Sequence, residues 1–105
     1  MQIRIKENSW IAKRAAKHLK TKRVALVIGN TIYLWQTSRQ DFLNNKCWLQ
    51  HELQHVQQFK KFGLFRFLFL YLVESARSGY YNNKFEVEAR EKENQPFVYS
   101  NVEFI

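Results

Sequence analysis

The 105-residue chain is long enough for one domain with a single hydrophobic core, but not for two. Hydrophobic residues make up 46% of it and it holds one proline and three glycines, which excludes a disordered or linker-rich chain. Its formal net charge of +8 keeps nucleic acids and anionic membranes open as partners, although many soluble proteins have a basic surface without either.

The sequence shows neither a signal peptide nor a membrane span. No apolar run followed by small residues occurs at its beginning. The longest apolar stretch, 62–73, would rise about 18 Å as a helix, against about 30 Å for the bilayer core. We therefore expect a cytoplasmic protein without a transmembrane segment.

The lone Cys47 cannot form an internal disulfide, and we expect a buried apolar thiol rather than a redox-sensitive group or a metal ligand.

The first expected elements are a strand and a helix. Residues 2–6 alternate between polar and apolar types, which is typical of a strand with one buried face. Ser9 can then cap a helix to about Lys20 that is apolar on one side. The other side of this helix is basic. Together with the residues that follow, it carries Lys13, Arg14, Lys17, Lys20, Lys22 and Arg23.

A hairpin and a long helix are expected next. Residues 24–28 and 31–35 are rich in types that favour strands, and the Gly-Asn pair between them suits the positive φ angles of a tight turn. Ser38 resembles a helix cap with an acidic residue three positions later. We expect the helix that it opens to run to about Lys61 and to be the central helix of the domain.

The remaining residues predict two further helices and a last strand. Residues 64–73 indicate a helix that is buried on most sides, and Gly79 breaks the pattern. The Asn82-Asn83 pair can cap a helix over about 84–94. The tail 97–105 alternates in part and is a candidate strand.

These elements together predict an α+β fold. We expect a small antiparallel sheet, the central helix, and two or three further helices. No internal repeat or flexible linker divides the chain. Residues 1–105 are therefore expected to form one domain.

The central helix contains the most informative motif. His51-Glu52-Leu53-Gln54-His55 has the pattern His-Glu-x-x-His. Histidines four apart project from the same face of a helix, so that both can bind one zinc ion. Glu52 is suited to accept a proton from water held at an open position of that ion. The alternative is a pair of ordinary buried histidines that hydrogen-bond to their neighbours.

Two histidines do not complete a zinc site, and the third histidine, His18, lies on the basic helix. We expect a carboxylate from a later helix, where Glu86 and Glu88 are the candidates. They point in different directions on a helix, so only one can be the ligand. Each also has an ordinary explanation, Glu86 as a capping carboxylate after Asn83 and Glu88 as a solvated charge.

Two segments of the chain resemble bacterial zinc metallopeptidase domains of the gluzincin type. They are Trp48–Gln58, which holds the histidine pair, and Tyr80–Arg90 downstream. The resemblance covers roughly 24–92. In that family the first Glu of a Glu-x-x-Ala segment on a later helix is the third ligand, which implies Glu86 here, with Ala89 at the small position.

The resemblance also implies details of fold and site. It implies a zincin-like minimal domain in which an edge strand beside the zinc helix pairs with the extended substrate, and 31–35 is the candidate for that strand. Relatives often carry an acidic residue just after the alanine, where it orients a ligand histidine. This chain has Arg90 there.

The leading functional hypothesis is therefore a zinc-dependent metallopeptidase that hydrolyses peptide bonds. One Zn²⁺ per chain would be held by His51, His55 and Glu86, with Glu52 as the general base. The substrate would be a peptide or protein. Because 105 residues leave little to wall a deep cleft, the chain would act on an unstructured partner or as part of a larger assembly.

Two alternatives stay open. One is a non-catalytic zinc-binding interaction domain, which would have no use for a base at Glu52. The other is a module that binds nucleic acid or a membrane surface through its basic helix. Tyr80 and Tyr81 precede the candidate third ligand, and either phenol could stabilise a tetrahedral intermediate, although packing is their ordinary role.

Overall fold

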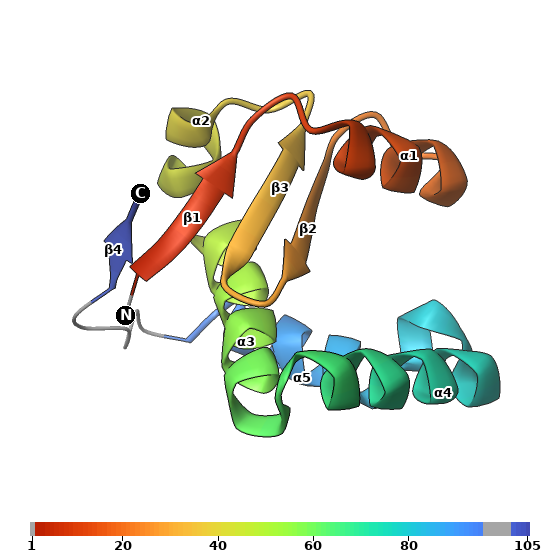
Figure 1. Ribbon diagram of the computed structural model, residues 1–105. Coiled ribbons are helices and arrows are strands. Elements are labelled where there is room, and N and C mark those ends of the chain that lie inside the picture. The colour runs from red at the N-terminus through yellow and green to blue at the C-terminus, as the bar shows by residue number, and fades with distance from the viewer. Residues whose placement is uncertain (1, 96–101) are drawn as a thin grey trace.

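The computed structural model describes residues 2–95 and 102–105 (Figure 1). In chain order, the elements are β1 (Gln2–Lys6), α1 (Trp10–Leu19), β2 (Val24–Ile28), β3 (Thr31–Trp35), α2 (Arg39–Asn44), α3 (Lys46–Phe62), α4 (Leu64–Asn82), α5 (Lys84–Lys92) and β4 (Glu103–Phe104). This combination of helices with one small sheet confirms the α+β class. Within the described residues, no helix is long and apolar enough to cross a membrane.

The sheet is mixed, so the prediction of an antiparallel sheet is wrong. Its strands lie in the order β2-β3-β1-β4, and β1 is parallel to both β3 and β4. Among the described strands, only the β2–β3 hairpin is antiparallel. The reason is the crossover through α1, which takes the chain past β1 to the far edge before the hairpin returns it (Figure 1). Apolar alternation within a strand does not encode the direction of its neighbours.

The edge strand beside the central helix is β2. It packs against α3, whereas β3 is paired on both sides. The expectation that 31–35 forms the edge strand next to the zinc helix is therefore wrong, and residues 24–28 take that place. The hairpin itself was predicted correctly, and Gly29 has the positive φ, 65°, that its turn requires.

The long helix predicted after Ser38 is in fact two helices. Ser38 caps α2 as predicted, since its Oγ accepts a hydrogen bond from the Asp41 amide at 3.0 Å. Asn45 then leaves the helical conformation, with φ −89° and ψ 90°, and its side chain caps α3 by accepting from the Trp48 amide. Asparagine side chains compete with the helical backbone in this way. Four further helices, instead of two or three, accompany α3 in the described part of the chain.

The last two helices lie where they were predicted, but α4 is less buried than predicted. Gly79 interrupts α4 with a φ of 80°, as expected, and Asn83 caps α5. Phe67, however, is the one buried residue of α4, so the prediction of a helix buried on most sides is wrong. Of the candidate strand 97–105, residues 97–101 lie outside the described residues, and β4 occupies part of the remainder.

The hydrophobic core lies between the sheet and α3. Buried side chains of β1 and β3 face the apolar side of α3, with Phe42 of α2 closing one end. The principal members are Ile3, Ile32, Leu34, Phe42, Leu49, Leu53 and Val56. In Figure 1, α3 runs between the sheet above and α4 and α5 below. One side of α3 is thus fixed on the sheet while another side faces α5, which positions the histidines.

Candidate metal centre

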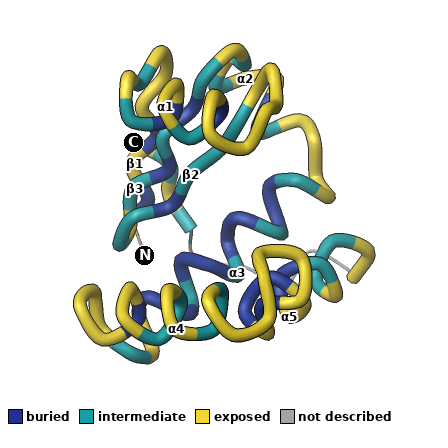
Figure 2. Tube along the Cα trace, turned by 90° about the vertical axis from the view of Figure 1, so that its right-hand side faces the viewer, coloured by how far each residue is buried: buried dark blue, intermediate teal, exposed yellow. Residues whose placement is uncertain are grey.

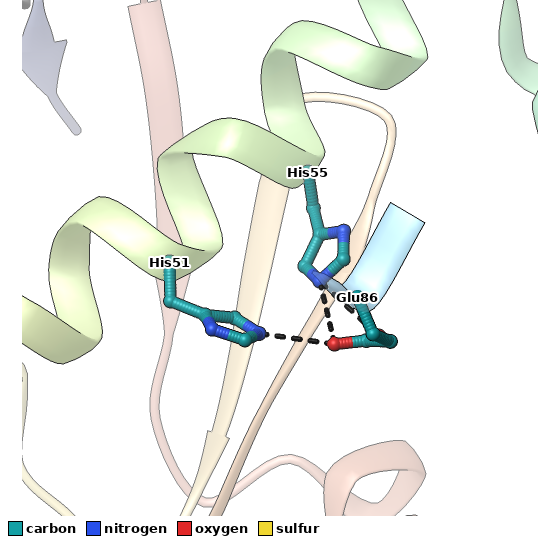
Figure 3. Close-up of side chains that lie close together, drawn as sticks. All are labelled: His51, His55 and Glu86. Carbon is teal, nitrogen blue, oxygen red and sulfur yellow. Dashed lines mark hydrogen bonds and ion pairs between the residues drawn. The ribbon is translucent and has the colours of Figure 1, made fainter. Parts of the chain in front are cut away.

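His51 and His55 lie one helical turn apart on the side of α3 that faces α5. Their rings meet edge to face, with centroids 5.1 Å apart. Glu86 projects from the first turn of α5 toward both rings (Figure 3). All three residues are mostly or fully buried. The structure thus brings together the three ligands predicted from the sequence.

The Glu86 carboxylate sits against both imidazoles. Its Oε1 is 3.0 Å from His51 Nε2, and His55 Nε2 is 3.2 Å from each carboxylate oxygen. One donor atom from each side chain lies within 4.8 Å of the others, and no other such group of metal-ligating residues occurs in the part of the chain that the structure describes. Neighbouring ligands around a tetrahedral zinc ion are about 3.3 Å apart, given bonds of about 2.0–2.1 Å. Two nitrogens and one carboxylate oxygen at this spacing could hold one metal ion.

Each ligand histidine is held by its second ring nitrogen. His51 Nδ1–H donates to Glu93 Oε2 at 2.7 Å, and His55 Nδ1–H donates to Gln58 Oε1 at 2.8 Å. We assign the Nδ1 protons from these acceptors. With the Nδ1 protons held in this way, both Nε2 atoms face Glu86, to which they donate in the absence of a metal ion. A metal ion that displaced these Nε2 protons would meet two lone pairs beside the carboxylate, as metal-ligating histidines require.

The hydrogen bonds of Gln58 also account for the position of Glu88, which lies outside the candidate cluster. The Gln58 amide donates to the Phe85 carbonyl at 3.1 Å and to Glu88 Oε1 at 3.2 Å. Glu88 is exposed and further accepts a hydrogen bond from Gln54. Its carboxylate therefore supports the amide that orients His55, whereas Glu86 faces both histidines.

Glu93 is a candidate functional residue that the sequence reasoning missed, since it contacts His51. The resemblance directed attention to position 90, where Arg90 instead donates to the Tyr81 carbonyl and covers the Tyr81 ring. Glu93 follows Glu86 by seven residues, which is two helical turns and therefore the same face. The spacing of seven residues was the feature of the sequence that could have identified Glu93. An acidic partner for a ligand histidine is thus present, one turn later than expected.

Tyr71 and Asn83 fix the position of Glu86. The Tyr71 hydroxyl donates to Glu86 Oε2 and leaves Oε1 toward His51. Asn83 is fully buried, accepts from the Phe85 amide at 2.8 Å, and donates to the Tyr71 carbonyl and to Ser75 Oγ. These bonds join the start of α5 to α4, three residues before the ligand carboxylate.

The electrostatics of the cluster favour positive charge. Burial alone would lower the pKa of His51, but hydrogen bonding to Glu86 and the charge of Glu52 raise it to about 9. The pKa of His55 is raised by the same two carboxylates against its burial. Burial would raise the pKa of Glu86, yet its bonds with the two histidines hold that pKa well below the usual range. A site that stabilises protonated imidazoles in this way also suits a bound cation.

Glu52 lies beside the cluster without ligating it. Its side chain is buried, and burial raises its pKa to about 7, against the lowering effect of the two histidines. A carboxylate with a pKa near neutrality can both accept and release a proton at physiological pH. Glu52, the predicted base, therefore lies next to the candidate ligands with a pKa near neutrality.

A cleft of about 240 Å³ opens in front of the cluster. Its walls come from β2 and α3, with parts of α1 and α4, and are largely apolar. His51, Glu52, His55 and Glu86 all line it, and so does Tyr80. Burial, together with the charges of Glu86 and Glu52, raises the Tyr80 pKa to about 12, so its phenol is a hydrogen-bond donor at neutral pH. Tyr81 is 70% exposed and does not line this cleft.

Two other candidate residues lie outside the cluster. Cys47 is exposed, with Sγ 3.8 Å from Asn94 Oδ1, so the expectation of a buried thiol is wrong. Its position in the first turn of α3, on the side away from the core, accounts for this exposure. His18 is exposed near the end of α1. Neither belongs to the group of candidate ligands among the described residues.

The chain was compared with models of protein families, with curated proteins and with solved structures. None of them matches it. Its resemblance to gluzincins therefore stays a prediction based on two segments of sequence, and function has to be argued from the geometry of the site.

Proposed function

We propose that the protein is a zinc-dependent metallopeptidase. The observation that carries the proposal is the meeting of His51, His55 and Glu86 at 3.0–3.2 Å beside a buried Glu52. A purely structural zinc site has four protein ligands and no adjacent base. Here three candidate ligands and one candidate base line an open cleft, which supports a catalytic rather than a structural site.

The chain's own residues divide the chemistry between them. Bound zinc would supply Lewis acidity, which polarises a substrate carbonyl and lowers the pKa of water. Glu52 would take the proton from the attacking water and deliver it to the amine that leaves. The Tyr80 phenol, protonated at neutral pH, would donate to the oxygen on which negative charge develops.

The edge strand β2 supports a peptide as substrate. It lines the cleft along its whole length, and β3 occupies only one of its two edges. An extended peptide could pair with the open edge and so lie across the metal site. The apolar walls, which include Phe59 and Phe67, would favour a hydrophobic side chain next to the scissile bond.

The test is cleavage of an unfolded protein, such as reduced casein, by the zinc-loaded chain. Glu52→Gln is expected to keep zinc and to lose activity by a factor of about 10² or more, because a general base typically contributes 10²–10⁴. Glu91→Gln is the matched control, since Glu91 is an exposed glutamate of α5 away from the cleft. Zinc binding without cleavage, or equal cleavage by Glu52→Gln, would refute the proposal. The first result would favour a non-catalytic zinc domain.

A further inference from the structure

The outer face of α4 is apolar and exposed. This face consists of Phe65, Leu68, Phe69, Leu72 and Val73, and Phe65, Phe69 and Leu72 are 83%, 67% and 66% exposed. These residues follow helical spacing and lie opposite the inward-facing side of the helix. In Figure 2, α4 runs along one border of the molecule and is largely coloured as exposed.

A helix that is apolar on both sides requires a partner on each. The inward side has one, because Phe67 packs against Phe59 and Phe85. The outer face has no cover from the described residues. Single exposed apolar residues are common, but a contiguous patch of this kind marks a site of interaction with a protein or a membrane.

The charges beside the outer face are positive. Lys60 and Lys61 precede α4, and Arg66 and Arg77 lie on its exposed side. The single acidic residue of α4, Glu74, is half-buried and accepts a hydrogen bond from Ser78. A second copy of the chain packed on this face would bring like charges together, with +8 on each copy. An anionic surface, in contrast, complements the basic border.

The shape of the patch also suits a membrane. The helical part of α4 before Gly79 rises about 22 Å, too short to cross a bilayer but long enough to lie in its interface. Aromatic and leucine side chains on one face, bordered by lysine and arginine, are typical of helices that lie in the plane of an anionic membrane. We propose that the outer face of α4 docks the protein on an anionic membrane surface.

Docking would also orient the cleft. Leu68 belongs to the outer face and lines the cleft at the metal centre. The cleft would therefore open next to the lipid surface. Membrane docking does not depend on the proposed peptidase activity, but if both hold, segments of membrane-associated proteins become the accessible substrates.

The test is binding of the full chain to vesicles, measured by flotation. Phosphatidylcholine vesicles that contain phosphatidylglycerol are compared with pure phosphatidylcholine. The double variant Phe65→Ser/Phe69→Ser is expected to reduce partitioning at least about tenfold, because each ring would leave the interface. Trp10→Ser is the matched control, since Trp10 is 70% exposed and belongs to α1, which lies across the cleft from α4 (Figure 1). All of these residues are exposed, so the variants should fold, which circular dichroism will verify.

A second pair of variants tests the role of charge. Arg66→Gln/Arg77→Gln should weaken binding to the anionic vesicles up to about 25-fold, since each basic residue near the surface contributes about fivefold. Arg14→Gln/Lys17→Gln removes the same charge from the exposed side of α1 and should have less effect. The proposal is overturned if the wild-type chain does not bind anionic vesicles, or if the α1 pair reduces binding more than the α4 pair. Self-association that Phe65→Ser/Phe69→Ser abolishes, without any vesicle binding, would instead identify a protein interface.

Discussion

Both ligand histidines depend on a second residue for their orientation. His51 uses Glu93 and His55 uses Gln58, and in each case the supporting oxygen accepts from Nδ1. An imidazole that is free to rotate, or that carries its proton on Nε2, must be oriented or lose that proton before it ligates through Nε2, which lowers the affinity for metal. The affinity for a metal ion would therefore also depend on Glu93 and Gln58, which would not contact the ion.

Glu93→Gln tests this dependence. An amide in this place has no negative charge and can present its NH₂ group to Nδ1, so zinc affinity is expected to fall about 10–100-fold. Competition with a chromogenic chelator measures the change. Glu91→Gln, with its exposed side chain on the same helix, should bind zinc as the wild type does. Equal affinities for both variants would contradict the role of Glu93.

The members of the candidate cluster were predictable from the sequence, but the residues that support them were not. His51 and His55 share a face through their spacing of four, and Glu86 was one of two candidates. The choice between Glu86 and Glu88 depended on how α5 rotates against α3, which is a tertiary property. Glu93 lies just beyond the end of α5, where a helical pattern no longer predicts orientation.

At the scale of elements, Asn83 links α4 to α5. Its carbonyl oxygen caps α5, and its amide nitrogen bonds to Ser75 Oγ at 2.8 Å and to the Tyr71 carbonyl at 3.1 Å. The residue has no exposed surface. Loss of this side chain would leave buried polar groups of both helices without partners.

Asn83→Ala is therefore expected to reduce the free energy of unfolding by about 2–4 kcal/mol, which combines a lost cap with buried unsatisfied groups. Urea denaturation measures it. Asn82→Ala is the matched control, because Asn82 is exposed and precedes the cap. Its expected effect is within about 0.5 kcal/mol. Similar losses in the two variants would show that Asn83 does not join these helices as described.

The prediction of elements succeeded for features that nearby residues determine, and it failed for features that depend on distant parts of the chain. The caps at Ser9, Ser38 and Asn83 and the turn at Gly29 are local features, and the structure contains all of them. The order and direction of the strands depend on the crossover through α1, which no local pattern specifies. The break at Asn45 shows that a side-chain cap can override helical periodicity.

At the scale of the whole molecule, the candidate metal centre joins α3 to α5. These two helices form one of the largest contacts between elements, and the ligands come from both. A cation held by His51, His55 and Glu86 would bind only when the two helices are packed together. Metal binding is then part of the stability of the fold.

Zinc is therefore expected to stabilise the folded chain. At a free concentration a thousand times the Kd, the gain is about 4 kcal/mol, which raises the melting temperature by many degrees. Thermal denaturation with zinc and with a chelator measures the shift. In His55→Ala the shift should be largely lost, whereas in the control Cys47→Ala, at an exposed residue outside the cluster, it should persist. A shift of equal size in His55→Ala would place the stabilising ion elsewhere.

The most direct test of the central claim is the metal content of purified chains, determined by elemental analysis after saturation with zinc and desalting. The wild type and Glu91→Ala should each retain one zinc ion per chain, whereas Glu86→Ala should retain little, since the two histidines alone do not complete a site. Retention of zinc by Glu86→Ala at the wild-type level would contradict the assignment of the third ligand. A wild-type chain that takes up no zinc would contradict the metal centre itself.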